Sequence, residues 1–284
     1  MLASRTQLLP PSPALAPYVQ AIAVRRPGLQ GPALPAVQCF PANVLGALTV
    51  LHRGDWLDAD SGQPMAPLEL AGPRLAPARR RYANDPAVTT VLLRPGVLNW
   101  LFDMPAADWV GRRRPVQEII GSAATEALAR RLDRAGSTAA HVWLVEQALQ
   151  DWVRQASARV CWTPPPEAPC GATVLDWAQA APWSTRQLQR RVTERLGLTP
   201  KAWLRIERLQ ASLVQLSQGA PLADIAHRCG YSHAAHMARE FRALTGLSPA
   251  GVRRDMTRHE GLPWRLAATD LPGARQDQAF TQST

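Results

Sequence analysis

The chain has 284 residues, of which 46% are hydrophobic and 19% are charged, a balance that indicates a globular protein. No apolar run approaches the roughly 20 residues of a membrane helix, and the first residues do not resemble a secretion signal, so neither membrane insertion nor secretion is expected. The formal net charge of +10, carried by arginines and the single lysine Lys201, favours an anionic partner such as nucleic acid.

The positive charge is denser in the C-terminal part of the chain. Between Gly171 and Arg258 there are 13 basic and 6 acidic side chains, whereas Met1–Val160 has 17 and 12. The four cysteines are scattered without any CxxC pair, which predicts a reduced protein in the cytoplasm. They are Cys39, Cys161, Cys170 and Cys229.

The first part, up to about Arg114, is rich in proline and glycine and predicts a compact β-rich domain. Short apolar runs bounded by turn residues predict strands at Val44–Leu51, Leu68–Leu70 and Val88–Leu93. We expect Asn84-Asp85-Pro86 and Arg94-Pro95-Gly96 to interrupt regular structure, and the arginine runs Arg79–Arg81 and Arg112–Arg114 to be solvated loops.

Helical patterns follow. Val97–Phe102 predicts a short helix, and Pro105–Trp109 predicts a turn or a second short helix. Gly121–Ala135 and Ala139–Arg154 predict longer ones. The second of these has an apolar stripe that would pack on its own domain or on a second subunit.

Four prolines between Cys161 and Cys170 mark an interdomain linker. We therefore divide the chain into an effector or dimerisation domain (1–155), a proline-rich linker (156–171), a DNA-binding domain (172–258) and a disordered tail (259–284). A redox switch between the two cysteines is a minor alternative.

The DNA-binding domain contains two helix-turn-helix patterns. In the first, Ser184 is predicted to cap a helix whose exposed side chains could contact DNA bases and phosphates. These residues are Arg186, Gln189 and Arg190. An apolar helix over Ala202–Gln218 leads to the second pattern, where Ser232 is predicted to cap a helix. Its exposed residues would be His233, Ala234, Ala235, Ala238 and Arg239. Arg239 is the only strong base or phosphate reader in that set.

These patterns resemble the AraC/XylS family of bacterial transcription regulators. The residues that carry the likeness include Asp224-Ile225-Ala226, Cys229-Gly230-Tyr231, SHAAHMAREF at Ser232–Phe241 and Gly246-Leu247-Ser248-Pro249. In the first unit they include Gln189-Arg190 and GLTPK at Gly197–Lys201. The resemblance implies an all-α domain that reads double-stranded promoter DNA with both units and recruits RNA polymerase. Because Ala234 and Ala235 replace polar readers, the second unit is expected either to read few bases or only to grip phosphates.

The N-terminal half is similar to the small effector domains of one branch of this family, through Leu15–Val19, Gly72, Leu93–Gly96 and Phe102–Val116. That similarity implies an α+β fold that is β-rich, cupin-like and closed by helices, with a small-molecule effector, a homodimer contact, or both. Trp100, Phe102 and Trp109 are candidates to line its ligand pocket, although ordinary core is the commoner role of such aromatics.

The function expected from these features is sequence-specific transcription regulation, with no catalytic residues, cofactor or metal. The six histidines form no ligand pattern, and His227 and Cys229 are expected to be structural. One alternative is a DNA-tethered enzyme like the repair alkyltransferases that carry the same module, although the cysteine spacing does not match theirs. Another is a ligand-free interaction domain on the same module.

Overall fold

The computed structural model describes residues 6–26, 37–165, 168, 172–258 and 264. Within them, one antiparallel sheet forms the N-terminal domain in the order β1-β2-β6-β4-β5-β7, with β3 paired to the first residues of β6. The strands are β1 (Thr6–Leu9), β2 (Val19–Arg25), β3 (Val37–Phe40), β4 (Gly46–Asp58), β5 (Leu68–Ala71), β6 (Ala78–Leu93) and β7 (Arg113–Pro115).

The two faces of this sheet have different compositions because successive side chains of a strand alternate between faces. On β4, Leu48 and Val50 join the apolar core beneath the helices, whereas Ala47 and Thr49 line a cavity on the other face. The same alternation occurs on β2, β5 and β6. All seven strands contribute residues to the cavity wall, so the sheet curls around it.

The predicted strands are present, but the expected break at Asn84-Asp85-Pro86 is wrong, because β6 runs through it from Ala78 to Leu93. The pairing with β4 is irregular there: Arg53 pairs with Ala87 and Asp55 with Ala83, so β6 advances four residues while β4 advances two. A proline is tolerated in a strand at such irregular positions because no regular ladder bond is lost.

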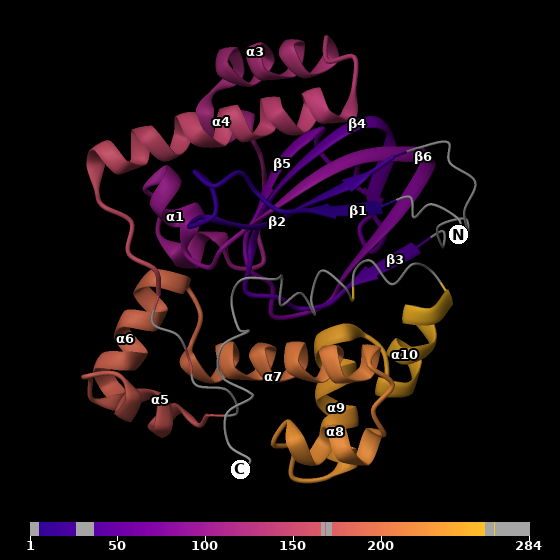
Figure 1. The fold of residues 1–284 in the computed structure, drawn as a ribbon, viewed down its shortest axis with the longest axis vertical. Coiled ribbons are helices and arrows are strands. Elements are labelled where there is room, and N and C mark those ends of the chain that lie inside the picture. The colour runs from indigo at the N-terminus through magenta and orange to yellow at the C-terminus, as the bar shows by residue number, and fades with distance from the viewer. Residues whose placement is uncertain (1–5, 27–36, 166–167, 169–171, 259–263, 265–284) are drawn as a thin grey trace, which may run out of the picture.

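The helices of this domain are α1 (Val97–Phe102), the 3₁₀ helix η1 (Ala106–Trp109), α2 (Gln117–Ile120), α3 (Ser122–Asp133) and α4 (Thr138–Arg159). Figure 1 shows α3 and α4 lying over the sheet. Val145, Leu149 and Trp152 of α4 are buried in the same core as the strands. The apolar stripe therefore packs on its own domain, while Trp143 on the same helix is 56% exposed.

α4 continues to Arg159, past the predicted start of the linker, and the next residues are anchored rather than free. The Trp162 ring lies 5.3 Å from that of Trp100, which stacks on Tyr18 at 5.1 Å. Most of the remaining linker, including Cys170, lies outside the described residues, as does the predicted tail apart from Trp264.

The C-terminal domain is all-α, as predicted. Its helices are α5 (Val174–Ala180), α6 (Thr185–Leu196), α7 (Pro200–Ser217), α8 (Leu222–Arg228), α9 (Ala234–Thr245) and α10 (Pro249–Arg258). The long α7 lies between the α5–α6 pair and the α8–α9 pair (Figure 1). Its buried residues, including Ile206, Leu209 and Leu213, form the centre of one apolar core.

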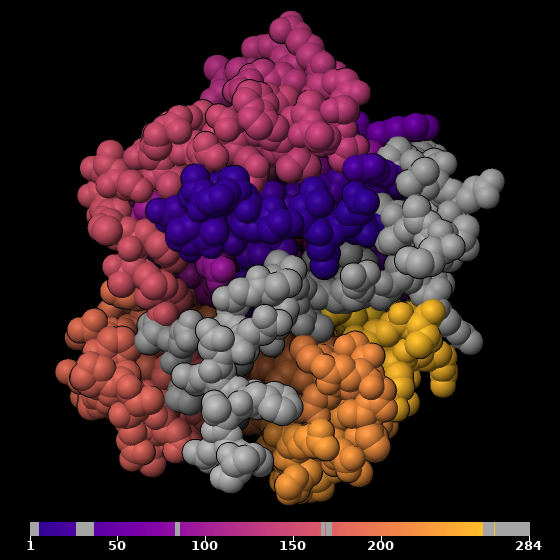
Figure 2. All heavy atoms as spheres, in the orientation of Figure 1, coloured from indigo at the N-terminus to yellow at the C-terminus, as the bar shows by residue number. Residues whose placement is uncertain are grey.

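The two domains are in contact. Figure 2 shows the C-terminal domain, coloured salmon to yellow, directly beneath the N-terminal domain. Ala42 and Val44, between β3 and β4, are buried in the core cluster of the C-terminal domain. Among the described helices, none is long and apolar enough to cross a membrane.

Candidate nucleic-acid interface

The first candidate recognition helix, called a reading helix below, is α6. Ser184 caps it as predicted: its side chain accepts from the Gln187 backbone N–H, and the Gln187 side chain accepts from the Ser184 N–H in return. Leu188, Val192 and Leu196 are buried. The predicted readers Arg186, Gln189 and Arg190 are exposed on the opposite face. Arginine forks match guanine edges and phosphates, and glutamine matches adenine.

The second reading helix, α9, begins one residue later than predicted. His233 is its N-cap, with Nδ1 accepting from the His236 backbone N–H at 3.0 Å. The predicted cap, Ser232, instead contacts the His236 ring, with its hydroxyl 3.1 Å from Nδ1. The cap prediction was therefore wrong by one residue. His233, proposed as a DNA contact, is exposed but has a capping role.

The two reading helices have the same length and the same kinds of ends, so their residues can be matched position by position. Each has 12 residues between an N-cap, Ser184 or His233, and a left-handed glycine, Gly197 or Gly246. Counted from the caps, Arg186, Gln189 and Arg190 therefore correspond to Ala235, Ala238 and Arg239. Ala234, Ala235 and Arg239 are exposed, and Ala238 is half-buried.

Sequence reasoning missed Arg242, which is exposed on α9. It lies one helical turn beyond Ala238 and three residues beyond Arg239, so it extends the exposed face of that helix. The equivalent residue on α6 is Thr193. The i, i+4 spacing from Ala238 was the signal that could have identified it. The second unit thus presents two cations and small side chains, whereas the first presents two cations and an amide.

A buried carboxylate fixes α9 against α7. Glu240, whose side chain is 11% exposed, accepts from Arg205 at 2.7 Å and lies 3.6 Å from Arg208. The Arg208 guanidinium also lies over the Tyr231 ring, and burial raises the pKa of Tyr231 to about 12. With 18 residues, α7 spans about 27 Å. That length, with the widths of the two units, suits reading sites about one DNA turn (~34 Å) apart.

Both units touch the N-terminal domain at the ends of their reading helices. At the end of α6, a Cβ added to Gly197 would lie 2.5 Å from the carbonyl oxygen of Ala106 in η1. At the end of α9, the Ala42 backbone N–H donates to the Leu244 carbonyl at 2.7 Å. The Cys39 thiol donates to the Thr245 carbonyl at 3.1 Å.

The segment from Gln38 to Asn43 separates the cavity of the N-terminal domain from the C-terminal domain. Gln38, Phe40, Pro41 and Asn43 line the cavity of the N-terminal domain, which has a volume of about 110 Å³. Cys39 and Ala42, which alternate with them, contact the end of α9. We call residues 38–43 the shared wall.

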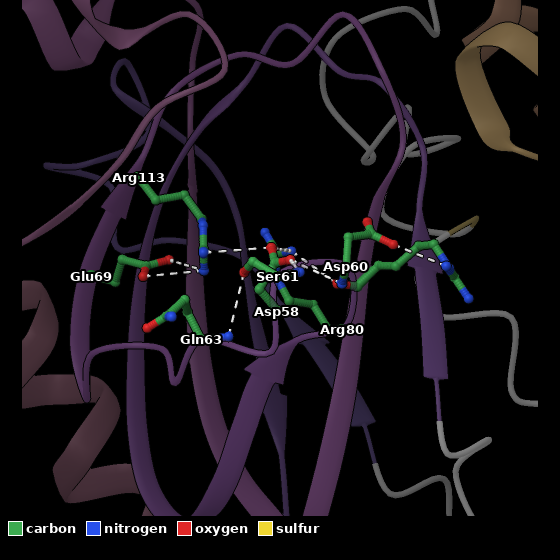
Figure 3. A network of polar contacts seen from close by, with 8 residues as sticks. Asp58, Asp60, Ser61, Gln63, Glu69, Arg80 and Arg113 are labelled. Atoms are coloured by element: carbon green, nitrogen blue, oxygen red, sulfur yellow. Dashed lines mark hydrogen bonds and ion pairs between the residues drawn. The ribbon is translucent and has the colours of Figure 1, made fainter.

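The prediction that both arginine runs are solvated loops is also wrong, because Arg79–Arg81 lies on β6 and Arg113 and Arg114 lie on β7, where Arg80 is buried and Arg113 is half-buried. Arg80 on β6 is 5% exposed and donates to Asp58 at 2.8 Å. Arg113 on β7 lies 3.4 Å from Glu69 and 3.5 Å from Asp58 (Figure 3). Burial raises the pKa of Glu69, against the opposing effect of Arg113. Alternation along β6 turns Arg80 inward between the exposed Arg79 and Arg81.

The aromatic residues predicted for a ligand pocket lie elsewhere. Trp100 stacks on Tyr18, and Phe102 lies between Trp109 and Trp152 at ring distances of 6.2 and 5.4 Å. None of Trp100, Phe102 and Trp109 lines the cavity around which the sheet curls. In the part of the chain that the structure describes, no three His, Cys, Asp or Glu residues are grouped to hold a metal ion.

Comparison with known proteins locates a family match in the C-terminal domain. Residues 177–255 match a family model described as a helix-turn-helix domain. The chain is 35% identical over 72 residues to the HTH-type transcriptional activator RhaS of Escherichia coli O1:K1 / APEC, and equally to that of strain S88. The matched stretch covers 25% of this chain and 26% of RhaS, so the chain spans about a quarter of the length of these relatives.

Solved structures similar to this one include ToxT from Vibrio cholerae O395, with 9% identity and a TM-score of 0.42 over 79% of this chain and 95% of that one. Another is unsaturated fatty acid bound wild-type ToxT from Vibrio cholerae strain SCE256, also at 9% identity and a TM-score of 0.42, covering 78% of this chain and 92% of that one.

Proposed function

We propose that this chain, whose C-terminal domain is a double helix-turn-helix of the AraC/XylS type, is a sequence-specific transcription regulator controlled through its N-terminal domain. The observation that carries this proposal is the pair of equivalent reading helices. Each has 12 residues and an exposed face with two arginines, Arg186 and Arg190 on α6 and Arg239 and Arg242 on α9.

The first unit supplies most of the sequence discrimination in this proposal. Arg186, Gln189 and Arg190 offer forked donors and an amide to base edges in the major groove. Arg239 and Arg242 can pair with guanine or with phosphate, but Ala235 and Ala238 offer only weak contacts to thymine methyl groups. We therefore expect one strongly and one weakly specified half-site.

The shared wall supports control by the N-terminal domain. A ligand in the cavity would touch Phe40 or Pro41, and the neighbouring Cys39 and Ala42 hold the end of α9. A ligand shifts the balance between arrangements of the domains only as far as it binds one of them better. In this proposal the effector favours an arrangement that places both reading helices on DNA, where the protein contacts RNA polymerase.

We further propose that the protein acts in the cytoplasm on promoter DNA, as a monomer or homodimer, without a catalytic step. Among the described cysteines, Cys39 is half-buried, Cys161 is exposed and Cys229 is buried. A metal assay and a methyl-transfer assay on the purified protein test the alkyltransferase alternative. Zinc with transfer to a cysteine would replace the regulator by a DNA-tethered enzyme.

The experiment that tests the regulator is selection of bound genomic fragments by the purified full chain at moderate salt, followed by sequencing. We expect a motif with two half-sites about one helical turn apart, one of them weakly specified. The matched variants are Arg190→Ala and Arg239→Ala, which remove equivalent arginines. The first should erase information from the strong half-site, and the second should weaken binding with little change in the motif. Enrichment of no motif, with or without candidate effectors, would refute the proposal.

A further inference from the structure

The cavity of the N-terminal domain holds more positive charge than its carboxylates neutralise. Arg80 and Arg113 line it and are paired with Asp58 and Glu69. Arg74 also lines it, and no carboxylate of the described residues lies within ion-pair distance of it. Burial, together with the charges of Arg80 and Arg113, lowers the pKa of Arg74 to about 10. An anion beside Arg74 would relieve this repulsion.

The cavity also holds buried donors that lack acceptors. Gln38 is 4% exposed and Trp56 is 7% exposed, and both line the cavity. Within the described residues, Gln38 Nε2, Trp56 Nε1 and Arg74 Nε have no hydrogen-bond partner. Buried polar groups are almost always satisfied, so unpartnered donors on three residues that line one cavity indicate a ligand that accepts hydrogen bonds.

The rest of the wall favours a small apolar body. Ala23, Ala47 and Ala71 face the cavity at the alternate positions of β2, β4 and β5, and Met65 and Leu92 complete this part. These short side chains create the space. A volume of about 110 Å³ is smaller than the roughly 150 Å³ of an engineered cavity that holds benzene. The occupant is therefore compact, or extends through the opening of the cavity.

We propose that this cavity binds a compact organic carboxylate, whose carboxylate group pairs with Arg74 and accepts from Gln38 while its apolar part lies against the alanines. The site stands on its own geometry, and its role as the effector site rests on the function proposed above.

Arg74 also connects the site to the DNA-binding domain. Its guanidinium donates to the Pro41 carbonyl at 3.3 Å, and its backbone exchanges two hydrogen bonds with Asn43. Pro41 and Asn43 flank Ala42, which is bonded to Leu244 at the end of α9. A carboxylate that draws the Arg74 guanidinium away from the Pro41 carbonyl would therefore remove a hydrogen bond from Pro41. Pro41 is the neighbour of Ala42, which makes the hydrogen bond between the domains.

The test is calorimetric titration of the full chain with straight-chain acids from acetate to hexanoate, benzoate, the matching primary amides, and inorganic phosphate. The amides keep the size and shape of the acids but carry no charge. We expect saturable binding of at least one acid, at least 10-fold tighter than its amide and than phosphate. Arg74→Gln should abolish this preference. Arg81→Gln, which removes an exposed arginine from the neighbouring strand β6, should retain it.

A second variant protects the test against misfolding of Arg74→Gln. Gln38→Glu places a carboxylate of nearly the same size in the cavity, where it should pair with the excess charge and reduce acid binding at least 10-fold. Equal binding of acid and amide, tighter binding of phosphate, or no saturable binding of any acid would overturn the carboxylate site.

Titration of selected genomic DNA with the same preparations separates this inference from the proposed function. Specific DNA binding without acid binding overturns the ligand class and leaves the regulator. Acid binding without specific DNA binding retains the site and refutes the regulator.

Discussion

The backbone N–H of Ala42 donates to the carbonyl oxygen of Leu244 over 2.7 Å, which joins the shared wall of the N-terminal domain to the last turn of α9. The last turn of α6 has a comparable contact, where Gly197 lies against the Ala106 carbonyl. Both reading helices are thus held at their C-terminal ends by one domain. Their relative placement depends on that domain as well as on α7.

The contact at Gly197 can be measured with a matched pair of glycines. Gly197→Ala and Gly246→Ala both place a side chain at a left-handed helix end, with φ of 69° and 76°. That conformation costs each variant about 1 kcal/mol. The added Cβ at residue 197 also meets the Ala106 carbonyl, whereas at residue 246 it meets Cys39 Sγ at 3.7 Å and Pro77 Cγ at 3.8 Å, which are ordinary contacts. We expect Gly197→Ala to be the more destabilising and to separate the domains.

Urea unfolding gives the stability, and the rate of proteolysis in the linker reports separation of the domains. Gly230→Ala, with φ of 72° and open space around the added Cβ, gives the backbone cost alone. Equal losses and equal proteolysis rates for all three variants would mean that the Gly197 contact does not hold the first unit.

Removal of the α6 side chains that are proposed to contact bases should weaken binding to the selected DNA site. Arg186→Ala or Arg190→Ala is expected to lose about 1–3 kcal/mol on the selected site. Arg190 lies 3.8 Å from Glu194, but such an exposed pair is weak and competes little with DNA. Glu194→Ala is the control and should not weaken binding. Fluorescence anisotropy gives the dissociation constants, and unchanged affinity in both arginine variants would remove α6 from the reading surface.

Arg242 is expected to contact phosphate rather than bases. Arg242→Ala should lower affinity for selected and random DNA by the same factor, and it should reduce the slope of log K against log salt by about 1. Lys201→Ala, which removes an exposed cation at the start of α7, is the comparison. A loss confined to the selected sequence would instead make Arg242 a base reader.

The role of His233 can be separated into capping and reading by choice of substitution. His233→Ala removes the acceptor of the His236 N–H and should cost about 1 kcal/mol of stability, with weaker DNA binding as a consequence. His233→Asn supplies another good cap, so it should recover both thermal stability and affinity. Recovery of stability without recovery of affinity would show that the imidazole itself contacts DNA.

The helical domain could be predicted from the sequence because its signals are local. The caps, the 3.6-residue periodicity and the terminal glycines together placed α6, α7 and α9 within about two residues. The cap of α9 was misplaced because Ser232 and His233 are both acceptors, and only the backbone geometry decides between them. The bounds predicted for Val97–Phe102 are those of α1.

The cavity could not be predicted because its wall is made by pairing between distant strands. Arg80 and Arg113 belong to runs that look solvated, and only their strand alternation turns them toward Asp58 and Glu69. Reading β6 as one strand through Pro86 would have supplied that alternation, but Asn84-Asp85-Pro86 is a strong turn signal by itself. The pairing of β6 with β4 on both sides of the irregularity outweighs it.

The histidine pair between the sheet and α4 predicts a pH dependence of stability. His52 Nε2 lies 2.9 Å from the Thr89 hydroxyl oxygen, and its ring centre lies 4.1 Å from that of His141. Burial, with a smaller contribution from His141, lowers the pKa of His52 to about 4. Arg25 and Arg26 line the same recess.

Because the folded pKa lies below the unfolded value of 6.5, the unfolded chain takes up the proton first as the pH falls. The free energy of unfolding should therefore decline between pH 6.5 and about 4, by on the order of 1 kcal/mol for a partly exposed ring. Below about pH 4 this contribution should stop changing.

His52→Gln keeps a polar group near Thr89 and removes the titration, so its melting temperature should fall less steeply over this range than that of the wild type. His227→Gln, which removes an exposed imidazole from α8, is the control and should follow the wild type. Parallel curves for wild type and His52→Gln would mean that folding leaves the pKa of His52 unchanged.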